Sequence, residues 1–248
     1  MIDLKSLENK LLNFLTNYLE TSYAKGFTIG VSGGLDSAIV ATLCSKIAPT
    51  YAILLPTKNS NKVNINDALN LCKTLGIKYE IIDIEPIIQS FLSAIKDADK
   101  LRIGNLAARV RMSILYDHSA KFRTLVVGTS NKSERMLGYG TIYGDTACAL
   151  NPIGEIYKSD LFLFAKYLGI DKNIIDKAPS ADLWEGQKDE DEIGYTYEQL
   201  DIILKEIERG KTKKELEESF DKNLVNTVYD RIEKNKFKLN LPLIANIQ

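Results

Sequence analysis

Residues 29–37 read Ile-Gly-Val-Ser-Gly-Gly-Leu-Asp-Ser, and this stretch decides how the rest of the chain is interpreted. An apolar run typical of a β-strand, residues 27–31, enters it, and a helical pattern, residues 38–43, follows it. A strand, a glycine turn and a helix N-terminus surround the turn with backbone N–H groups and the positive end of a helix dipole. Because glycines let a ligand approach the backbone closely, the stretch predicts an anion-binding site.

The acid at position 36 distinguishes this turn from other phosphate-binding loops. No Gly-Lys-Ser/Thr follows the glycines, which argues against a Walker A loop, and the Gly-x-Gly-x-x-Gly pattern of dinucleotide-binding folds is absent from it. Asp36 stands where a Walker A loop has its lysine. A carboxylate beside bound phosphates is favourable when a divalent cation lies between them, so the turn predicts a metal-assisted phosphate site.

The composition excludes several classes of protein. The 248 residues are 45% hydrophobic, which is enough for a sizeable core, and the formal net charge of -1 argues against an extended nucleic-acid or membrane surface. The N-terminus does not resemble a secretory signal, and no apolar run approaches the roughly 20 residues of a membrane span. Cys44, Cys72 and Cys148 form no Cys-x-x-Cys pair, which favours reduced thiols and a cytoplasmic location.

Strand-like and helix-like patterns alternate along the first half of the chain. Leucines three and four residues apart predict a helix within residues 4–19, and apolar runs at 51–55, 79–84 and 124–128 predict further strands separated by helices. Such alternation is typical of an open parallel sheet with helices on both faces. We therefore expect an α/β fold in a single domain spanning residues 1–248. Extra helical patterns follow in the C-terminal part, at residues 158–168, 196–208 and 221–234.

Two segments far apart in the sequence are expected to meet at one edge of this sheet. The Ser32-Gly33-Gly34 turn and the Gly128-Thr129 pair each follow a predicted strand. Ligands of open parallel sheets bind outside the carboxyl ends of the strands, where the strand order reverses. Residues 136–157 hold four glycines and little periodicity, so we expect them to form loops that line the same site.

The turn itself resembles a known phosphate-binding motif. Residues 32–37, Ser-Gly-Gly-Leu-Asp-Ser, are similar to the Ser-Gly-Gly-x-Asp-Ser pyrophosphate loop of the N-type ATP pyrophosphatases. Those enzymes cleave ATP between the α- and β-phosphates and adenylate a substrate. The resemblance implies a Rossmann-like three-layer sandwich, with Mg²⁺ as the cofactor.

Later segments select one branch of this group, the ammonia-dependent NAD synthetases. The segments that resemble that family are Gly104–Met112, Gly128–Glu134, Tyr143–Asp145, Asn151–Lys158, Pro179–Leu183 and Gly194–Asp201. The resemblance, from about residue 25 to 201, implies ATP-dependent amidation of deamido-NAD by ammonia, through an adenylated carboxylate, in the final step of NAD biosynthesis. AMP and pyrophosphate would be released, and the enzyme would be a homodimer. Because the synthetase pattern takes up the chain, we expect no glutaminase domain.

The resemblance also implies roles for individual residues. Asp36 and Glu134 would bind Mg²⁺, and Asp36 and Lys158 would be catalytic. ATP would contact Gly30, Val31, Ser32, Gly33, Gly34, Leu35, Asp36, Ser37, Thr129, Lys158 and Ser180. Deamido-NAD would contact Asn105, Arg109, Asp145 and Lys236.

Each of these roles competes with a plainer one. Glu134 could be a solvated acid of a first helical turn, Lys158 a surface lysine and Asp145 a turn residue. Arg102 and Arg111 are alternatives to Arg109 as the substrate-facing arginine.

The acidic stretch at residues 181–192 is either a solvated loop or a lid over ATP. The chain also departs from the family at Ile142, Ala149 and Asn235, where relatives commonly carry Lys, Asp and His. All three departures concern the nicotinate side of the site.

Two other functions compete with the synthetase. A tRNA thiolase-like ATP pyrophosphatase is disfavoured by the near-neutral charge and the missing Cys-x-x-Cys pair. A catalytically silent nucleotide-binding module is disfavoured because both Asp36 and Glu134 are present.

Overall fold

A four-stranded parallel sheet with strand order β3-β2-β1-β4 lies at the centre of the computed structural model, which describes residues 3–180, 186–187, 189–240, 244–245 and 247. The strands are β1 (Phe27–Gly30), β2 (Thr50–Leu54), β3 (Lys78–Ile81) and β4 (Leu125–Val126). The helices are α1 (Leu4–Ser22), α2 (Leu35–Ser45), α3 (Lys62–Leu75), α4 (Glu85–Ala94), α5 (Lys100–Phe122), α6 (Lys132–Leu137), α7 (Lys158–Tyr167), α8 (Lys172–Ile175), α9 (Asp189–Ile193), α10 (Tyr197–Glu208), α11 (Lys213–Ser219), α12 (Lys222–Asn235) and the 3₁₀ helix η1 (Lys236–Leu239).

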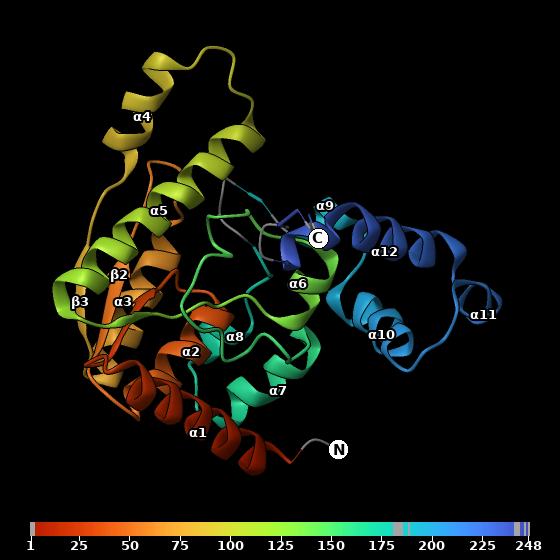
Figure 1. Cartoon of the computed structure of the whole chain (residues 1–248), viewed down its shortest axis with the longest axis horizontal. Coiled ribbons are helices and arrows are strands. Elements are labelled where there is room, and N and C mark those ends of the chain that lie inside the picture. Colours follow the sequence, from red (N-terminus) through yellow and green to blue (C-terminus); the bar gives the residue numbers. More distant parts are fainter. Residues whose placement is uncertain (1–2, 181–185, 188, 241–243, 246, 248) are drawn as a thin grey trace.

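Helices cover both faces of the sheet (Figure 1). On one face, α1, α2, α3, α7 and α8 share a buried apolar cluster with β1 and β2 that includes Ile39 and Phe164. On the other face, α4 and α5 pack through Ile88 and Val110 against Ile53. The expected α/β fold, an open parallel sheet with helices on both faces, is confirmed.

The edge strand β3 differs from the expectation of apolar strands buried on both faces. All four of its residues are exposed, and it pairs only with β2. Its sequence, Lys-Tyr-Glu-Ile, carries charges that protect an exposed sheet edge from pairing with other chains. The fourth predicted strand is also shorter than expected, because Val127 leaves β4 and forms an isolated bridge with Leu150.

The strand order creates the switch point that the sequence predicts. From β1 the chain moves outward through β2 to β3, and it then returns to place β4 on the other side of β1. The segments that follow β1 and β4 therefore leave the same edge of the sheet on either side of a crevice. One begins at Val31 and forms the glycine turn, and the other begins at Val127.

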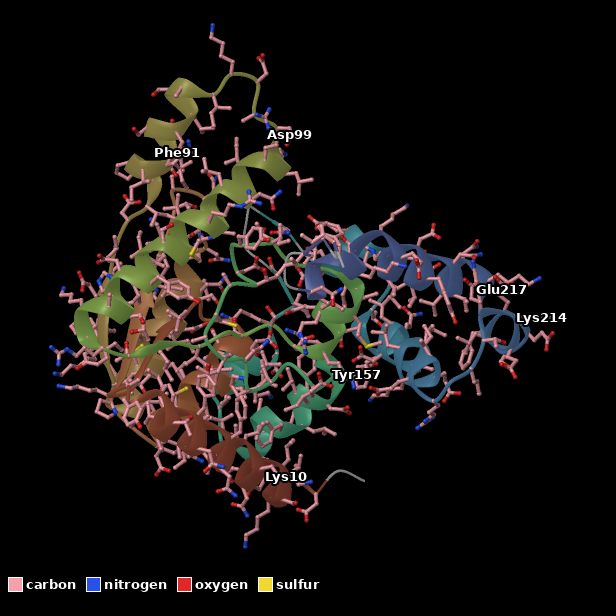
Figure 2. All side chains as sticks on the ribbon, in the orientation of Figure 1. Lys10, Phe91, Asp99, Tyr157, Lys214 and Glu217 are labelled. Carbon is pink, nitrogen blue, oxygen red and sulfur yellow. The ribbon has the colours of Figure 1, made fainter. Side chains whose placement is uncertain are left out.

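A third apolar cluster connects α6 with the C-terminal helices α10, α11 and α12, through residues such as Leu137, Leu200 and Leu216. In Figure 1 these helices lie together on the side away from β3. Tyr157, labelled in Figure 2, lies where this cluster meets α7, and its hydroxyl donates to Glu208 Oε2 at 3.0 Å. The extra C-terminal helices are thus present, while a single domain over residues 1–248 stays a prediction. Among the described residues, no helix is both long and apolar enough to cross a membrane.

The central position of α2 predicts a large effect of truncating its side chains. Ile39 is fully buried, so Ile39→Ala should lower the free energy of unfolding by about 2–5 kcal/mol by leaving a cavity. Chemical denaturation measures this change. Ile202 on α10 is 51% exposed and provides the matched control, for which Ile202→Ala should change the free energy by no more than about 0.5 kcal/mol. Similar effects at both positions would contradict the assignment of α2 to the packed centre.

Candidate active site

The glycine turn after β1 is held in shape by its own serines. The Ser37 hydroxyl donates to the Gly34 carbonyl at 3.0 Å, and the Gly34 N–H donates to Ser32 Oγ at 3.2 Å. Gly34 is the N-cap of α2, and no side chain caps this helix end. Gly33 has a φ of 81°, in the left-handed region that favours glycine. The turn therefore leaves the positive end of α2 open toward the crevice, as an anion site requires.

A buried cluster of charges lies beside this helix end. The Lys158 ammonium forms an ion pair with Asp36 Oδ2 and lies 3.9 Å from Glu134 Oε1. The Asn131 side-chain amide donates to Asp36 Oδ1 at 3.3 Å, which ties the segment after β4 to the turn after β1. Three elements that are distant in sequence thus place one cation between two acids.

Glu134 has a structural role and a position in the site at once. It closes a capping box at the start of α6, because its Oε2 accepts the Asn131 N–H at 3.2 Å while Asn131 Oδ1 accepts the Glu134 N–H. Glu134 is thus an acid in the first turn of α6, which is the alternative that the sequence left open. It also lines the cavity next to Asp36. Burial raises the pKa of Glu134 well above its usual range, and the neighbouring Asp36 charge raises it further.

The same environment keeps Lys158 charged. Burial by itself would lower the pKa of Lys158, but the carboxylates of Asp36 and Glu134 raise it above its ordinary value. Its ammonium also lies 5.7 Å from the centre of the Tyr197 ring, within range of a cation–π contact. Lys158 is buried, which argues against the interpretation as a surface lysine.

Helix α10 fixes the start of α7, where Lys158 lies. Asp201 is buried on α10, and its two carboxylate oxygens accept the Ser133 hydroxyl at 2.5 Å and the Ser159 N–H at 2.9 Å. Ser133 Oγ in turn accepts the Lys158 N–H at 2.9 Å. Burial raises the pKa of Asp201, which these hydrogen bonds partly oppose. The C-terminal helices therefore position the cation of the site.

A cavity of about 690 Å³ surrounds this cluster at the switch point. The sequence-predicted ATP residues that line it are Gly30, Val31, Ser32, Gly34, Leu35, Asp36, Ser37, Thr129, Lys158 and Ser180. Gly33 does not line it and instead packs against α3, where an added Cβ would lie 2.0 Å from the Asn64 carbonyl oxygen. The structure thus gathers residues that are up to about 150 positions apart around one space.

Only some of the residues predicted to contact the nicotinate substrate line the cavity. Asn105 and Asp145 line the cavity, and burial raises the pKa of Asp145. Arg109 does not line it, because its guanidinium donates to the Ile142 carbonyl at 3.3 Å. Arg111, the alternative that the sequence offers, does line it.

The C-terminal segment contributes a different lysine from the one expected. Lys236 Nζ pairs with Glu233 at 2.7 Å, and Lys236 does not line the cavity. Lys238 lines it instead, and its ammonium donates to the carbonyls of Gly138 and Gly140 at 2.8 and 3.0 Å. Arg231 also lines it, from α12. Sequence analysis missed both residues, because an isolated cation in a polar helix carries no pattern that marks it.

Residues 181–192, expected to be either a solvated loop or a lid, are only partly described, because 181–185 and 188 lie outside the described residues. Of the remainder, Asp189 is buried, and its Oδ1 lies 3.0 Å from the Tyr139 hydroxyl. Glu192 Oε2 lies 2.7 Å from the same hydroxyl. These contacts hold Asp189 and Glu192 against Tyr139, just after α6, while a lid that moves stays a prediction.

The donor chemistry of the cluster fits a magnesium ion. Asp36 and Glu134 offer hard carboxylate oxygens from two elements beside the helix end. Mg²⁺ typically takes one or two protein carboxylates and completes its shell with phosphates and water. Among the described residues, no group of three or more His, Cys, Asp or Glu that could hold a metal ion is found.

A second cavity, of about 530 Å³, adjoins the first. The two share Glu134, Tyr139 and Lys238 in their walls, and the second extends to Leu11 and Phe14 on α1. A ligand longer than one nucleotide could therefore reach from the charged cluster toward α1.

Comparisons with known proteins agree on one family. The profile of the NAD synthase family matches residues 7–242. An NH(3)-dependent NAD(+) synthetase from Campylobacter jejuni is 46% identical, with 99% of this chain and 100% of that protein covered. The solved structure of an NH3-dependent NAD synthetase from Campylobacter jejuni, in complex with the nitrate ion, has a TM-score of 0.86 at 40% identity and covers 99% of this chain and 100% of that one. The solved structure of an NMN synthetase from Francisella tularensis has a TM-score of 0.91 at 36% identity and covers 100% of both chains.

The buried Ser133 hydroxyl joins α6 to α7 and α10 by hydrogen bonds, so removing it should lower the stability of the protein. Ser133→Ala would leave the Lys158 N–H and Asp201 Oδ1 each without that partner, so the free energy of unfolding should fall by about 1–3 kcal/mol. The loss should shrink as the pH falls through the raised pKa of Asp201, because a protonated carboxyl depends less on the donor. Denaturation at several pH values measures both effects.

Ser113 provides the control for this prediction, because its hydroxyl donates to the Arg109 carbonyl on an exposed turn of α5. Ser113→Ala should change stability by no more than about 0.5 kcal/mol at any of these pH values. A Ser133→Ala effect of that same size would contradict the positioning of α7 by α10.

Proposed function

The chain belongs to the NAD synthase family, and on that premise we propose that it is a ligase that amidates deamido-NAD with ammonia, consuming ATP and releasing NAD, AMP and pyrophosphate. The observation that carries this proposal is the placement of Asp36, Glu134 and Lys158 at the open N-terminus of α2. That arrangement suits the transfer of an adenylyl group. The family match over residues 7–242 disfavours a tRNA thiolase.

The first chemical step is adenylation. A nicotinate carboxylate cannot expel hydroxide at neutral pH, so its oxygen attacks the α-phosphate of ATP, and the bond from that phosphorus to the bridging oxygen of pyrophosphate breaks. The backbone of residues 32–34 and the Ser37 hydroxyl would hold the β- and γ-phosphates. Lys158 would stabilise the negative charge that develops between the α- and β-phosphates. Most of the catalysis is then positioning and charge stabilisation.

Asp36 and Glu134 would hold Mg²⁺ against the phosphates during adenylation. When bound, the ion neutralises charge on the phosphate oxygens.

The second step is amide formation. The nitrogen of ammonia attacks the acyl carbon, and the bond from that carbon to the AMP oxygen breaks. The attacking nitrogen must also lose a proton, and the protein must supply the group that takes it. We assign this role to Asp145, because it lines the cavity and burial raises its pKa, which makes its carboxylate a stronger base. His118 lies outside the cavity, on α5.

We also propose that the protein works as a homodimer in the cytoplasm. Phe14 and Tyr18 stack with ring centroids 6.4 Å apart on an exposed part of α1, next to the second cavity, which offers an apolar surface for a second copy. Cys44, Cys72 and Cys148 are free thiols, which suits a reducing compartment.

Removing the Asp36 charge should stop the reaction. With ATP, Mg²⁺, ammonium and deamido-NAD, the wild-type protein should form NAD and AMP in equal amounts. Asp36→Asn should reduce that rate by at least about a hundredfold, the loss typical when a group that stabilises transition-state charge is removed. Asp230→Asn, on an exposed part of α12, should leave the rate unchanged. A wild-type protein that forms no NAD and exchanges no pyrophosphate into ATP would contradict the proposal.

A second candidate substrate is the corresponding mononucleotide. The likeness to the NMN synthetase favours it. The reacting carboxylate and the ATP site would be the same for both substrates. The difference is the AMP half of deamido-NAD, for which the second cavity offers room.

Competition between the two substrates decides between these candidates. We expect kcat/KM for deamido-NAD to exceed that for nicotinate mononucleotide by at least about tenfold, because contacts with the AMP half add roughly 1.4 kcal/mol or more. Initial rates with each substrate at fixed ATP and ammonium measure the ratio. A ratio below one would assign the chain to mononucleotide amidation.

A further inference from the structure

Lys177 lines the cavity beside the glycine turn and forms contacts that sequence analysis did not anticipate. Its ammonium donates to the Gly33 carbonyl and to Asn64 Oδ1, both at 2.8 Å, and forms an ion pair with Asp67 Oδ2 at 2.7 Å. Asn64 and Asp67 belong to the first turns of α3. One side chain therefore joins the turn after β1 to α3 and to the segment that leads to Ser180.

We propose that Lys177 is a positioning residue that fixes the glycine turn in its pyrophosphate-binding shape, so that it sets affinity for the β- and γ-phosphates without touching them. The inference rests on the proposed function in taking ATP and pyrophosphate as ligands of the turn.

The first argument is donor capacity. An ammonium group has three N–H donors, of which two go to the Gly33 carbonyl and to Asn64 Oδ1 at 2.8 Å, while the Asp67 carboxylate faces the same ammonium in an ion pair at 2.7 Å. The nearby carboxylate of Asp67 also offsets the positive charge of Lys177. Lys177 thus donates to the backbone of the turn itself, whereas the Lys158 ammonium faces only the acids Asp36 and Glu134 and the Tyr197 ring.

The second argument is the conformation of Gly33. It is the one residue of the 30–37 stretch that does not line the cavity, and its φ of 81° would be strained with any side chain. Its carbonyl is held by Lys177, so the peptide between Gly33 and Gly34 has a fixed orientation. A charge-assisted hydrogen bond to that carbonyl also polarises the peptide and makes the Gly34 N–H a better donor.

The third argument is that the backbone of Lys177 is itself anchored. It follows α8, whose Ile174 and Ile175 are buried in the apolar cluster beneath α2. The Lys177 side chain is 27% exposed and that of Asp67 is 12% exposed, so the pair is shielded from water and held on both sides. A fixed lysine can hold the turn in one shape before ATP binds, which reduces the ordering needed on binding.

The experiment compares inhibition by the two products. Pyrophosphate contacts the turn, whereas AMP does not reach it, so Lys177→Met should weaken inhibition by pyrophosphate and raise KM for ATP by roughly tenfold each, as expected when a hydrogen bond to a charged group is lost. Inhibition by AMP should change by less than about twofold. Lys46→Met is the matched control, because Lys46 forms a similar ion pair with Glu8 away from the cavity, and it should alter none of these constants.

A second variant separates positioning from direct contact with phosphate. Asp67→Asn removes the charge that holds the ammonium in place. If Lys177 contacted the phosphates, its release would strengthen inhibition by pyrophosphate; positioning predicts that inhibition weakens. Thermal melting shows whether Lys177→Met folds. If it does not, Asp67→Asn still tests whether Lys177 positions the turn.

Three results would overturn the inference: unchanged pyrophosphate inhibition in folded Lys177→Met, equal weakening by both products, or stronger pyrophosphate inhibition in Asp67→Asn. Calorimetric titration of the wild-type protein with ATP and Mg²⁺ distinguishes a failure of the proposed role of Lys177 from a failure of the proposed function. A wild-type protein that binds no ATP contradicts the proposed function. Normal wild-type binding with an unaffected Lys177→Met contradicts only the role of Lys177.

Discussion

The ion pair between the buried Lys158 and the half-buried Asp36 is the interaction on which the rest of the site depends. A buried charge without its partner is strongly destabilising, so the fold must bring the start of α7 and the start of α2 together. Glu134 adds a second carboxyl group 3.9 Å from the Lys158 ammonium, and burial together with the Asp36 charge raises its pKa. The switch point between β1 and β4 makes this meeting possible, because both segments leave the sheet at the same edge.

Side chains around this pair serve folding and chemistry together. Glu134 caps α6 while it faces Lys158, and Asp201 reaches from α10 to hold the start of α7. Tyr197, also on α10, places its ring against the Lys158 ammonium. The C-terminal helices are therefore support for the site, although their own apolar cluster is separate from those on the sheet. Such shared use ties the stability of α10 to the position of Lys158 beside the glycine turn.

The residues that sequence analysis found belong to a local motif, whereas those that it missed act through long-range contacts. The turn at residues 32–37 is a local motif, whose backbone shape follows from adjacent glycines, and it lies where expected. Lys177 and Lys238 make their contacts with residues about 100 or more positions away, through flexible side chains on polar segments. No periodicity or spacing marks such residues, so only the folded chain identifies them.

By itself the sequence determined the open parallel sheet, the helices on both faces and the glycine turn after β1, because periodicity and glycine conformation are local properties. Tertiary structure decided which cations face the cavity. Arg109 and Arg111 are two positions apart on α5 and so project from different faces, and only the rotation of α5 against the sheet turns Arg111 rather than Arg109 to the cavity. The same holds in the C-terminal segment, where the packing of η1 places Lys238 in the cavity wall rather than the predicted Lys236.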